Sequence, residues 1–361
     1  MFKQKFYSLE PILKKSCQYN LIIGERSNGK TYSVLLYGLK KYIETGEQMA
    51  YVRRWREDFI GKRGSVLFDG HIKNNVVEKL THGEYNSVYY FSSKWYLCLY
   101  EDGERVKVDE KPFCYAFSIA SAEHDKSTSY PDITTICFDE FLTRKYYLPD
   151  EFVQFMNLLS TIIRQRNNVK IFMLGNTVNY YAPYFAEMGI KHIKDMKQGD
   201  IDIYTYGDSK LQVAVELCKP NKQGKQSDFY FAFDNPKLSM ITGGYWEVDL
   251  YPHCPCKYTP KEIYFTYFIE FNGELLQCEI VRKKDGTFTF IHPKTTEIKD
   301  DTAIIFSFTD SYLPNHIKRI NKPSTQKTAV IWEFFKRDLV FYSDNNTGEI
   351  VKNYLNVCMG D

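Results

Sequence analysis

A glycine-rich loop constrains the possible folds of this chain more than any other feature. The loop GERSNGKT, residues 24–31, has the pattern G-x-x-x-x-G-K-[ST]. It follows the apolar stretch NLIIG at 20–24, which predicts a buried strand, and it opens an amphipathic helix that we expect to end at Gly46. In this setting the pattern predicts a phosphate-binding loop, because backbone N–H groups and the helix N-terminus favour bound phosphate.

The segments around this loop predict an α/β fold with a parallel sheet. Residues 65–118 are expected to be β-rich, and a helix is expected to begin at Pro149 and Asp150. Further buried strands are predicted at 48–54, 133–139 and 169–176. We therefore predict a P-loop ATPase domain of the ASCE or RecA-like type over residues 1–205.

Beyond this domain the patterns are weaker. Residues 206–260 are polar and rich in turn-forming residues, so we interpret them as a linker region, with a small subdomain as the alternative. Strand patterns return at 262–271, 275–281, 286–292 and 303–308, and helical patterns follow at 314–320 and 324–342. We predict a smaller α+β domain over residues 261–361.

Composition excludes several classes of protein. The formal net charge of the 361 residues is +2, so total charge alone does not indicate a nucleic-acid partner, although local clusters can. No apolar run approaches the roughly 20 residues that span a bilayer, and the first residues are mixed and charged. We therefore expect no membrane contact and a cytoplasmic chain with reduced thiols. Cys254 and Cys256 lack a second pair at zinc-binding spacing, which argues against a metal site there.

Residues with the chemistry of nucleotide hydrolysis stand at predicted strand ends. Lys30 would reach the β- and γ-phosphates, and the Thr31 hydroxyl would ligate Mg²⁺. Asp139 ends an apolar strand, where it could also hold Mg²⁺, and Glu140 follows in position to polarise water. An acidic pair can also cap a helix, but beside a phosphate-binding loop the functional interpretation is favoured. Glu directly after Asp fits motor-type and recombinase-type ATPases rather than GTPases.

Four further residues could complete the site, and their positions in the sequence leave each role open. Arg164 and Arg166 follow the predicted helix, where they could reach the γ-phosphate of a neighbouring subunit or complement the helix C-terminus. Lys126 stands in a polar loop, where a solvated charge is the ordinary interpretation. Asn176 ends a strand and could sense the γ-phosphate or start a turn.

The stretch YVRRWREDFIGKRG, residues 51–64, combines basic and aromatic side chains. It follows a predicted strand at the edge of the sheet where ligands bind. A basic loop there could contact a nucleic-acid backbone, and a solvated charged loop is the alternative.

These motifs together resemble the packaging ATPases of small short-tailed phages of the phi29 type. The shared segments, in the same order and spacing, are GERSNGKTYS, GEQMAYVRR, KSTSYPDITTICFDEF, TIIRQR and FMLGN. The resemblance is specific over about residues 19–185 and weaker beyond. Two of the segments, GEQMAYVRR and the YP…FDEF stretch, are not general features of P-loop proteins, so they carry more weight than the loop itself.

The resemblance implies a homopentameric motor that binds ATP and Mg²⁺. It also implies docking on the procapsid portal in the host cytoplasm, where the motor drives double-stranded DNA into the shell. Some members of that family also dock on a structural packaging RNA. The second half would be an RNase H-like domain derived from a nuclease but without nuclease activity.

The resemblance also assigns roles to individual residues. The catalytic group would be Glu140, Arg164, Lys30 and the trans-acting Lys126, with Mg²⁺ on Thr31 and Asp139. The nucleotide would contact Gly24, Arg26, Asn28, Gly29, Lys30, Thr31 and Asn176. The DNA-contacting loop would include Arg56, Lys62 and Arg63.

Two other functions remain possible at this stage. A helicase or a terminase with a live nuclease would need a carboxylate cluster in the second half, where Glu270, Glu279 and Asp310 are scattered. A nucleotide-gated scaffold would bind ATP without hydrolysing it, and Glu140 argues against that alternative.

Overall fold

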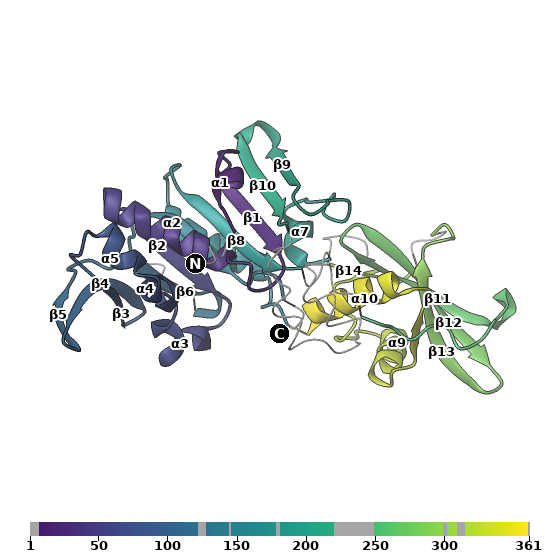
Figure 1. The fold of residues 1–361 in the computed structure, drawn as a ribbon. Helices are drawn as coiled ribbons and strands as arrows, with labels where there is room; N and C mark the ends of the chain where they lie inside the picture. Colours follow the sequence, from purple (N-terminus) through teal and green to yellow (C-terminus); the bar gives the residue numbers. More distant parts are fainter. Residues whose placement is uncertain are drawn as a thin grey trace. The chain divides into compact units, whose positions relative to one another are not determined.

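The chain is described from a computed structural model, and it divides into two compact units (Figure 1). The described residues are 7–121, 128–143, 146–177, 181–219, 249–298, 302–308 and 315–359. The first unit falls within residues 1–142, 150–178 and 192–246, and the second within 143–149, 179–191 and 247–361. Among the described residues, no helix has the length and apolar character needed to cross a membrane.

The first unit is built on a mixed sheet whose central strands are parallel. Its order is β3-β4-β6-β2-β7-β8-β1-β10-β9, with β5 paired to β4. The strands are β1 (Tyr19–Gly24), β2 (Gln48–Arg53), β3 (Ser87–Phe91), β4 (Lys94–Glu101), β5 (Glu104–Val108), β6 (Cys114–Ser118), β7 (Ile133–Asp139), β8 (Lys170–Asn176), β9 (Ile201–Tyr206) and β10 (Leu211–Leu217). The run from β6 to β10 is parallel, which confirms the predicted α/β fold.

Helices cover both faces of this sheet. The longer ones are α2 (Lys30–Thr45) and α6 (Glu151–Ile163); the shorter ones are α1 (Glu10–Leu13), η1 (Arg56–Phe59), α3 (Lys62–Ser65), α4 (Asp69–Lys73), α5 (Val76–Leu80) and η3 (Gly207–Ser209). The α2 side chains share one apolar core with Cys137, whereas Phe155 of α6 packs on Phe138 with ring centroids 4.8 Å apart. Because neighbouring strand residues point to opposite faces, α2 and α6 lie on opposite sides of the sheet.

Two predictions for the first unit are wrong. The stretch predicted to be β-rich from residue 65 begins with the short helices α4 and α5 instead, and strands start only at Ser87. The sheet also continues past residue 205, because β10 pairs in parallel with β1 inside the predicted linker region. Strand β10 is internal, so its carbonyl and amide groups are satisfied within the sheet rather than exposed in a linker.

The second unit contains a separate mixed sheet of order β15-β14-β11-β12-β13-β16. Its elements are α7 (Pro183–Glu187), η5 (Pro260–Glu262), β11 (Ile263–Phe271), β12 (Glu274–Lys283), β13 (Gly286–Pro293), β14 (Ile305–Ser307), β15 (His316–Ile317), α9 (Gln326–Lys336), β16 (Val340–Tyr342) and α10 (Asn345–Cys358). Buried side chains of α10, including Ile350 and Tyr354, share a core with Tyr267 and Cys278 of the sheet.

The four strand patterns predicted for the second half are confirmed. The helix predicted at 324–342 is confirmed over α9 but is wrong at its end, because Val340–Tyr342 form strand β16 beside β13. The helix predicted at 314–320 is wrong where the structure describes it, because His316 and Ile317 form strand β15 beside β14. The C-terminal helix α10 was not predicted.

Candidate nucleotide-binding and catalytic site

The predicted phosphate-binding loop joins β1 to α2 along a path that requires glycine at two positions. Gly29 has a φ of +92°, in the left-handed region that glycine favours, and it directly precedes the first helical residue, Lys30. A Cβ on Gly24 would lie 2.7 Å from the Cβ of Cys218, so a side chain there would clash. The buried Asn28 side chain accepts a hydrogen bond from the Lys30 amide at 3.2 Å, while Arg26 in the same loop is exposed.

The Lys30 ammonium group is buried at the centre of this loop. It donates to the carbonyl oxygens of Gly24 at 3.2 Å and Glu25 at 2.7 Å, and to Oδ1 of Asn176 at 3.4 Å. Burial lowers the pKa of Lys30, against the opposing pull of nearby anionic groups such as Asp139. The structure therefore brings together Lys30 and Asn176, both of which were predicted from the sequence to lie near the γ-phosphate.

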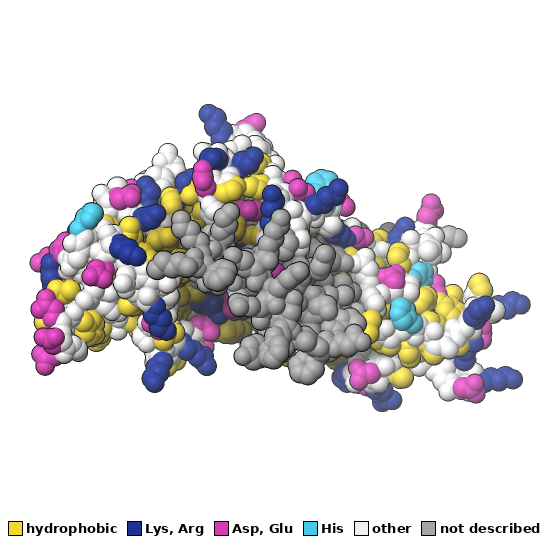
Figure 2. Space-filling model, in the orientation of Figure 1, with side chains coloured by type: hydrophobic (Ala, Val, Ile, Leu, Met, Phe, Trp, Pro, Cys, Tyr) yellow, Lys and Arg dark blue, Asp and Glu magenta, His cyan; other side chains and the backbone are white. Residues whose placement is uncertain are grey.

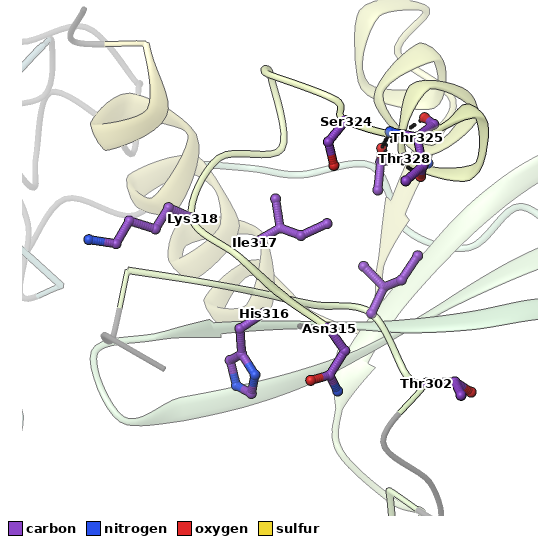
Figure 3. A pocket seen from close by; sticks show the side chains of 9 residues that line it. Thr302, Asn315, His316, Ile317, Lys318, Ser324, Thr325 and Thr328 are labelled. Carbon is purple, nitrogen blue, oxygen red and sulfur yellow. Dashed lines mark hydrogen bonds between the residues drawn. The ribbon is translucent and has the colours of Figure 1, made fainter. Parts of the chain in front are cut away.

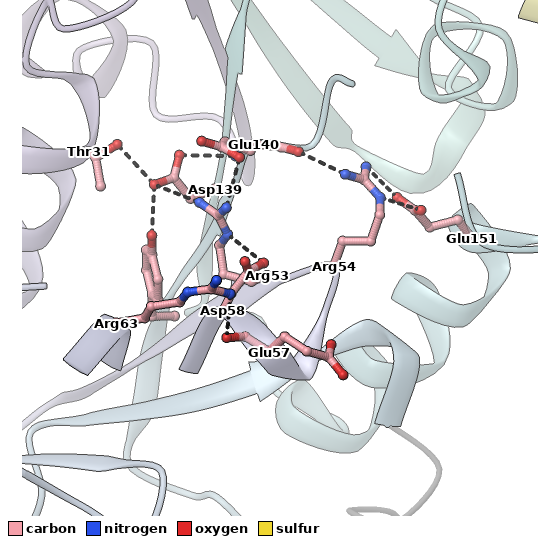
Figure 4. A network of polar contacts seen from close by, with 10 residues as sticks. Thr31, Arg53, Arg54, Glu57, Asp58, Arg63, Asp139, Glu140 and Glu151 are labelled. Atoms are coloured by element: carbon pink, nitrogen blue, oxygen red, sulfur yellow. Dashed lines mark hydrogen bonds and ion pairs between the residues drawn. The ribbon is translucent and has the colours of Figure 1, made fainter. Parts of the chain in front are cut away.

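The second predicted metal ligand lies directly against the loop (Figure 4). Thr31 donates its hydroxyl hydrogen bond to Oδ2 of Asp139 at 3.0 Å, and the Tyr51 hydroxyl donates to the same oxygen at 2.8 Å. Burial raises the pKa of Asp139, although Arg53 and the two hydroxyl donors counteract this effect. Two oxygen groups of the type that Mg²⁺ prefers thus meet at the mouth of the loop.

Glu140 directly follows the end of β7, and its carboxylate pairs with a cation (Figure 4). Its backbone has a φ of +58°, an uncommon conformation for a residue with a side chain. Its carboxylate lies 2.8 Å from Nη2 of Arg53, which also contacts Asp58 at 3.2 Å and Asp139 at 3.9 Å. Glu140 is therefore next to the site and is held by an ion pair.

Tyr51, Arg53 and Arg54 also belong to this site, although no sequence pattern assigned them to it. All three stand at the carboxyl end of β2, and β2 pairs in parallel with β7 in a register that matches Val52 to Phe138. Carboxyl ends of neighbouring parallel strands meet at one sheet edge. Arg53 follows Val52, and Asp139 follows Phe138, so the register places Arg53 beside Asp139. Pairing of the two predicted strands was therefore the signal in the sequence that could have assigned Arg53 to this site.

The two candidate arginines after α6 differ in their surroundings. Arg164 is exposed, and Nη2 donates to the carbonyl of Thr128 at 3.0 Å. Arg166 donates to a cluster of backbone carbonyls, those of Pro131 at 2.7 Å, Ile133 at 2.6 Å, Tyr130 at 3.0 Å, Ile162 at 2.7 Å and Ile163 at 3.2 Å. Arg166 thus holds the start of β7 against the end of α6, whereas Arg164 is exposed to solvent. Lys126 lies outside the described residues.

The predicted DNA-contacting residues lie in η1 and α3, directly after β2. Arg56, Lys62 and Arg63 are exposed, and dark-blue basic side chains gather over the α3 region in Figure 2. Nη1 of Arg63 donates to the carbonyl of Glu57 at 3.0 Å. A cavity of about 260 Å³ is lined by Tyr51 and Arg53 of β2, by residues of the basic loop such as Arg63, and by Trp95.

The acids singled out in the second half do not form a metal cluster in the described residues. Glu270 accepts a hydrogen bond from Ser307 at 2.9 Å, and Glu279 accepts one from Tyr258 at 2.6 Å, while Asp310 lies outside the described residues. Across the described parts of the chain, no group of three or more His, Cys, Asp or Glu is placed to hold a metal ion. A cavity of about 550 Å³ lies between β15 and the start of α9, lined by His316, Lys318, Ser324 and neighbours (Figure 3).

The sequence of the first unit matches a known family. Residues 1–213, from the start of the chain into β10, match the podovirus DNA encapsidation protein (Gp16) family. This chain belongs to that family. The match includes every residue of the site described above, from Gly24 to Asn176.

Individual relatives match about half of the chain. The DNA packaging protein of Bacillus phage phi29 is 31% identical over 188 residues, which are 51% of this chain and 50% of that protein. The DNA packaging protein of Bacillus phage B103 is 29% identical over 174 residues, 47% of this chain and 48% of that protein. The chain thus spans about half the length of the curated relatives it matches.

Solved structures resemble the fold over nearly the whole chain. The phi-28 gp11 DNA packaging motor aligns with a TM-score of 0.59 and 19% identity over 99% of both chains. The phi-29 viral genome packaging motor assembly aligns with a TM-score of 0.56 and 19% identity over 96% of both chains. At these identities the likeness concerns the fold alone.

Proposed function

We propose that this chain is the ATP-hydrolysing subunit of a phage DNA-packaging motor. In this proposal a homopentameric ring moves double-stranded DNA through the portal into a procapsid in the host cytoplasm. The observation that carries the proposal is the 3.0 Å hydrogen bond between Thr31 and Asp139, because it joins a phosphate-binding loop to an acidic strand end. Membership in the encapsidation family supports the same function, as do relatives named DNA packaging proteins.

The donor set at the loop fits ATP with Mg²⁺. The buried Lys30 ammonium and the loop amides would hold the phosphates, since both are donors to anionic oxygen. The Thr31 hydroxyl and the Asp139 carboxylate would hold Mg²⁺, which takes oxygen ligands. When bound, the ion would neutralise charge that develops on the β- and γ-phosphates.

Three residues would then perform the proton and charge work of hydrolysis. Glu140 would leave Arg53, orient the attacking water and accept its proton. Asn176 lies 3.4 Å from the Lys30 ammonium, close enough to the phosphate end to respond to the γ-phosphate. Arg164 is exposed and would extend into the site of the adjacent subunit, where it would stabilise the charge on the γ-phosphate.

Strand order supports the finer fold assignments within this proposal. In the first unit β8 lies between β1 and β7, the arrangement expected of an ASCE or RecA-like ATPase. In the second unit β11, β12 and β13 form an antiparallel meander, and β14 pairs in parallel with β11. We infer an RNase H-like fold for the second unit from that order.

The basic loop supports the proposed contact with DNA. The exposed Arg56, Lys62 and Arg63 follow β2 directly, on the strand end that also carries Arg53. A movement of Glu140 that shifts Arg53 would therefore also shift the residues proposed to contact the DNA phosphates. A motor of this type would also bind the phage portal. Some motors of the phi29 type also bind a structural packaging RNA, which is therefore a further proposed partner.

Mixed-subunit ATPase assays test the proposal. Glu140→Gln and Arg164→Ala subunits should each be inactive alone, and mixing them should restore phosphate release at interfaces that take Glu140 from one subunit and Arg164 from the other. The rate should rise steeply with protein concentration and respond to double-stranded DNA. A rate per subunit that is independent of concentration, with no rescue on mixing, would overturn the ring mechanism.

A further inference from the structure

A buried arginine next to the site connects two elements that the proposed mechanism treats as separate. Arg54 and Glu151 form a two-pronged ion pair, with Nε to Oε2 at 2.6 Å and Nη2 to Oε1 at 2.8 Å. Their side chains are only 7% and 2% exposed. Glu151 is the first residue of α6, so this pair fixes the start of that helix to the end of β2 (Figure 4).

The same guanidinium group also holds the backbone that carries the catalytic glutamate. Arg54 donates to the carbonyl of Glu140 at 3.3 Å and to the carbonyl of Phe141 at 2.9 Å. The φ of Glu140 is +58°, a conformation that persists only when its surroundings impose it. The hydrogen bonds from Arg54 are among the contacts that impose it.

The connection continues along α6 to the exposed arginine. The helix runs from Glu151 to Ile163 and is followed at once by Arg164, so its ends are about 20 Å apart at 1.5 Å per residue. Phe155 packs it onto β7, and Arg166 holds its last turn to the start of the same strand. A helix held at both ends moves as one body, so a shift at Glu151 would be carried to Arg164.

Stability alone gives a weak reason for this arrangement. Burying a paired guanidinium and carboxylate costs desolvation, and apolar side chains of similar volume often stabilise a fold as well or better. Arg54, at the end of β2, instead binds two consecutive carbonyls after β7 and the carboxylate that begins α6. It thereby specifies the relative positions of three segments.

We propose that Arg54 is a positioning residue that couples Glu140 in one subunit to Arg164, which that subunit presents to its neighbour. This inference rests on the proposed ring ATPase. The Arg54–Glu151 pair links two positions: that of Glu140 in the subunit's own site, and that of Arg164 in the site of the next subunit. A movement of one is therefore accompanied by a movement of the other.

The test uses full-length chains in two mixtures, each with one kind of complete interface. The double variant Arg54→Met/Glu151→Leu removes both buried charges together, which avoids an unpaired charge. Placed in the Glu140→Gln background and mixed with Arg164→Ala subunits, it reports on how its own Arg164 is delivered. Placed in the Arg164→Ala background and mixed with Glu140→Gln subunits, it reports on its own Glu140.

We expect phosphate release to fall in both mixtures by about tenfold to a hundredfold, because small misplacements of reacting groups have effects of that size. Binding of a fluorescent ATP analogue should remain unchanged. The matched control is Arg337→Met/Glu333→Leu, which removes an exposed ion pair of the same chemistry at the C-terminal end of α9 and should leave both mixtures unaffected.

Other outcomes have distinct meanings. A loss confined to one of the two mixtures, or a loss in neither, would overturn the coupling while leaving the ATPase proposal intact. Failure of the two parent subunits to rescue each other would instead overturn the shared site, and the coupling with it. If the double variant does not fold, Arg54→Lys is tested in the same two mixtures, because lysine keeps the positive charge but cannot form the two-pronged contact. A loss of phosphate release in both mixtures again supports the coupling. A loss in only one mixture, or in neither, overturns it.

Discussion

The Arg53 guanidinium lies 2.8 Å from the Glu140 carboxylate, in an ion pair that joins the ends of two neighbouring strands. The Glu140 side chain is 56% exposed, so its direction depends on this partner more than on packing. In the proposed mechanism this pair is a resting arrangement, which opens before Glu140 acts on water.

Loss of this pair should raise the basal rate of ATP hydrolysis. A partly exposed ion pair is worth up to about 1 kcal/mol, so Arg53→Gln should release Glu140 and raise the DNA-independent rate by up to about fivefold. Steady-state phosphate release without DNA measures this change. Arg105→Gln, which alters an exposed arginine stacked on Tyr89, is the control. A rate that falls in Arg53→Gln would show that Arg53 assists hydrolysis instead of restraining it.

The Thr31 hydroxyl should determine the dependence on Mg²⁺. Thr31→Val keeps the shape of the side chain but removes the oxygen that lies 3.0 Å from Asp139, whereas Thr31→Ser keeps the oxygen. We expect Thr31→Val to need about tenfold or more Mg²⁺ for half-maximal activity, because even outer-shell partners change metal affinity by that factor. Titration of Mg²⁺ at saturating ATP measures it. Equal Mg²⁺ requirements for the Val and Ser variants would remove Thr31 from the metal site.

The two arginines after α6 should separate stability from activity. Arg166 donates to several backbone carbonyls, and charged hydrogen bonds contribute about 1.5–3 kcal/mol each, so Arg166→Ala should lower the free energy of unfolding by at least about 2 kcal/mol. Arg164→Ala should leave the melting temperature within about 2 °C, as expected for an exposed site, and should reduce hydrolysis by about a thousandfold. Urea unfolding and phosphate release measure the two effects. If Arg166→Ala abolishes hydrolysis without loss of stability, and Arg164→Ala lowers stability instead, Arg166 is the trans-acting residue.

The local parts of this site were predictable from the sequence, and the long-range parts were not. Lys30, Asp139 and Asn176 each end or begin an element with a clear apolar pattern, so their positions follow from the chain alone. These residues meet at one edge of the sheet because the strands that carry them or precede them pair in parallel. Tyr51 and Arg53 contact Asp139 across strands, and no periodicity along the chain encodes that contact.

Helices α4, α5 and α10 were missed for two different physical reasons. The first two have five residues each, too few to show a helical period. Helix α10 is long, but several of its buried residues are polar: Glu349 accepts a hydrogen bond from Tyr251, and the Asn353 side chain donates to the carbonyl of Glu349. Buried polar groups paired in this way weaken the apolar pattern on which a helix prediction depends.

The basic loop should contribute to DNA affinity through phosphate contacts. Replacing Arg56, Lys62 and Arg63 by alanine should weaken binding to all sequences equally. The slope of log K against log salt should become shallower by about 0.9 for every phosphate that is no longer neutralised. Fluorescence anisotropy with duplex DNA across a salt series measures the slope. Lys14→Ala/Lys15→Ala removes exposed lysines far along the chain from the loop and should leave it unchanged. An unaltered slope in the triple variant would place the DNA elsewhere.

The stability of the second unit should depend on pH through His292 and Glu279. Nε2 of His292 lies 3.5 Å from Oε1 of Glu279, and both side chains are largely buried. Burial alone would lower the pKa of His292, but the hydrogen bonds to Glu279 and to the Pro293 carbonyl raise it overall. Burial would likewise raise the pKa of Glu279, yet His292, Tyr258 and Gln277 together lower it.

The sign of the effect follows from the direction of each shift. A raised pKa of His292 in the folded state stabilises the fold fully below the ordinary histidine pKa of about 6.5, and that contribution is lost as the pH rises through the folded value. The lowered pKa of Glu279 contributes above the ordinary glutamate pKa of about 4.3 and is lost as the pH falls. The pair should therefore stabilise the second unit most between about pH 4.5 and 6.5.

Urea unfolding of the full chain at pH 5.5 and pH 8.5 tests this expectation. The unfolding free energy of the unaltered chain should fall between these values by more than that of His292→Gln, which has no ionisable ring. His82→Gln, an exposed histidine of the first unit, is the matched control and should keep the full pH dependence of the unaltered chain. If His292→Gln shows the same fall as the unaltered chain, the pH dependence comes from other groups, because removal of the imidazole would then have changed no proton uptake on unfolding.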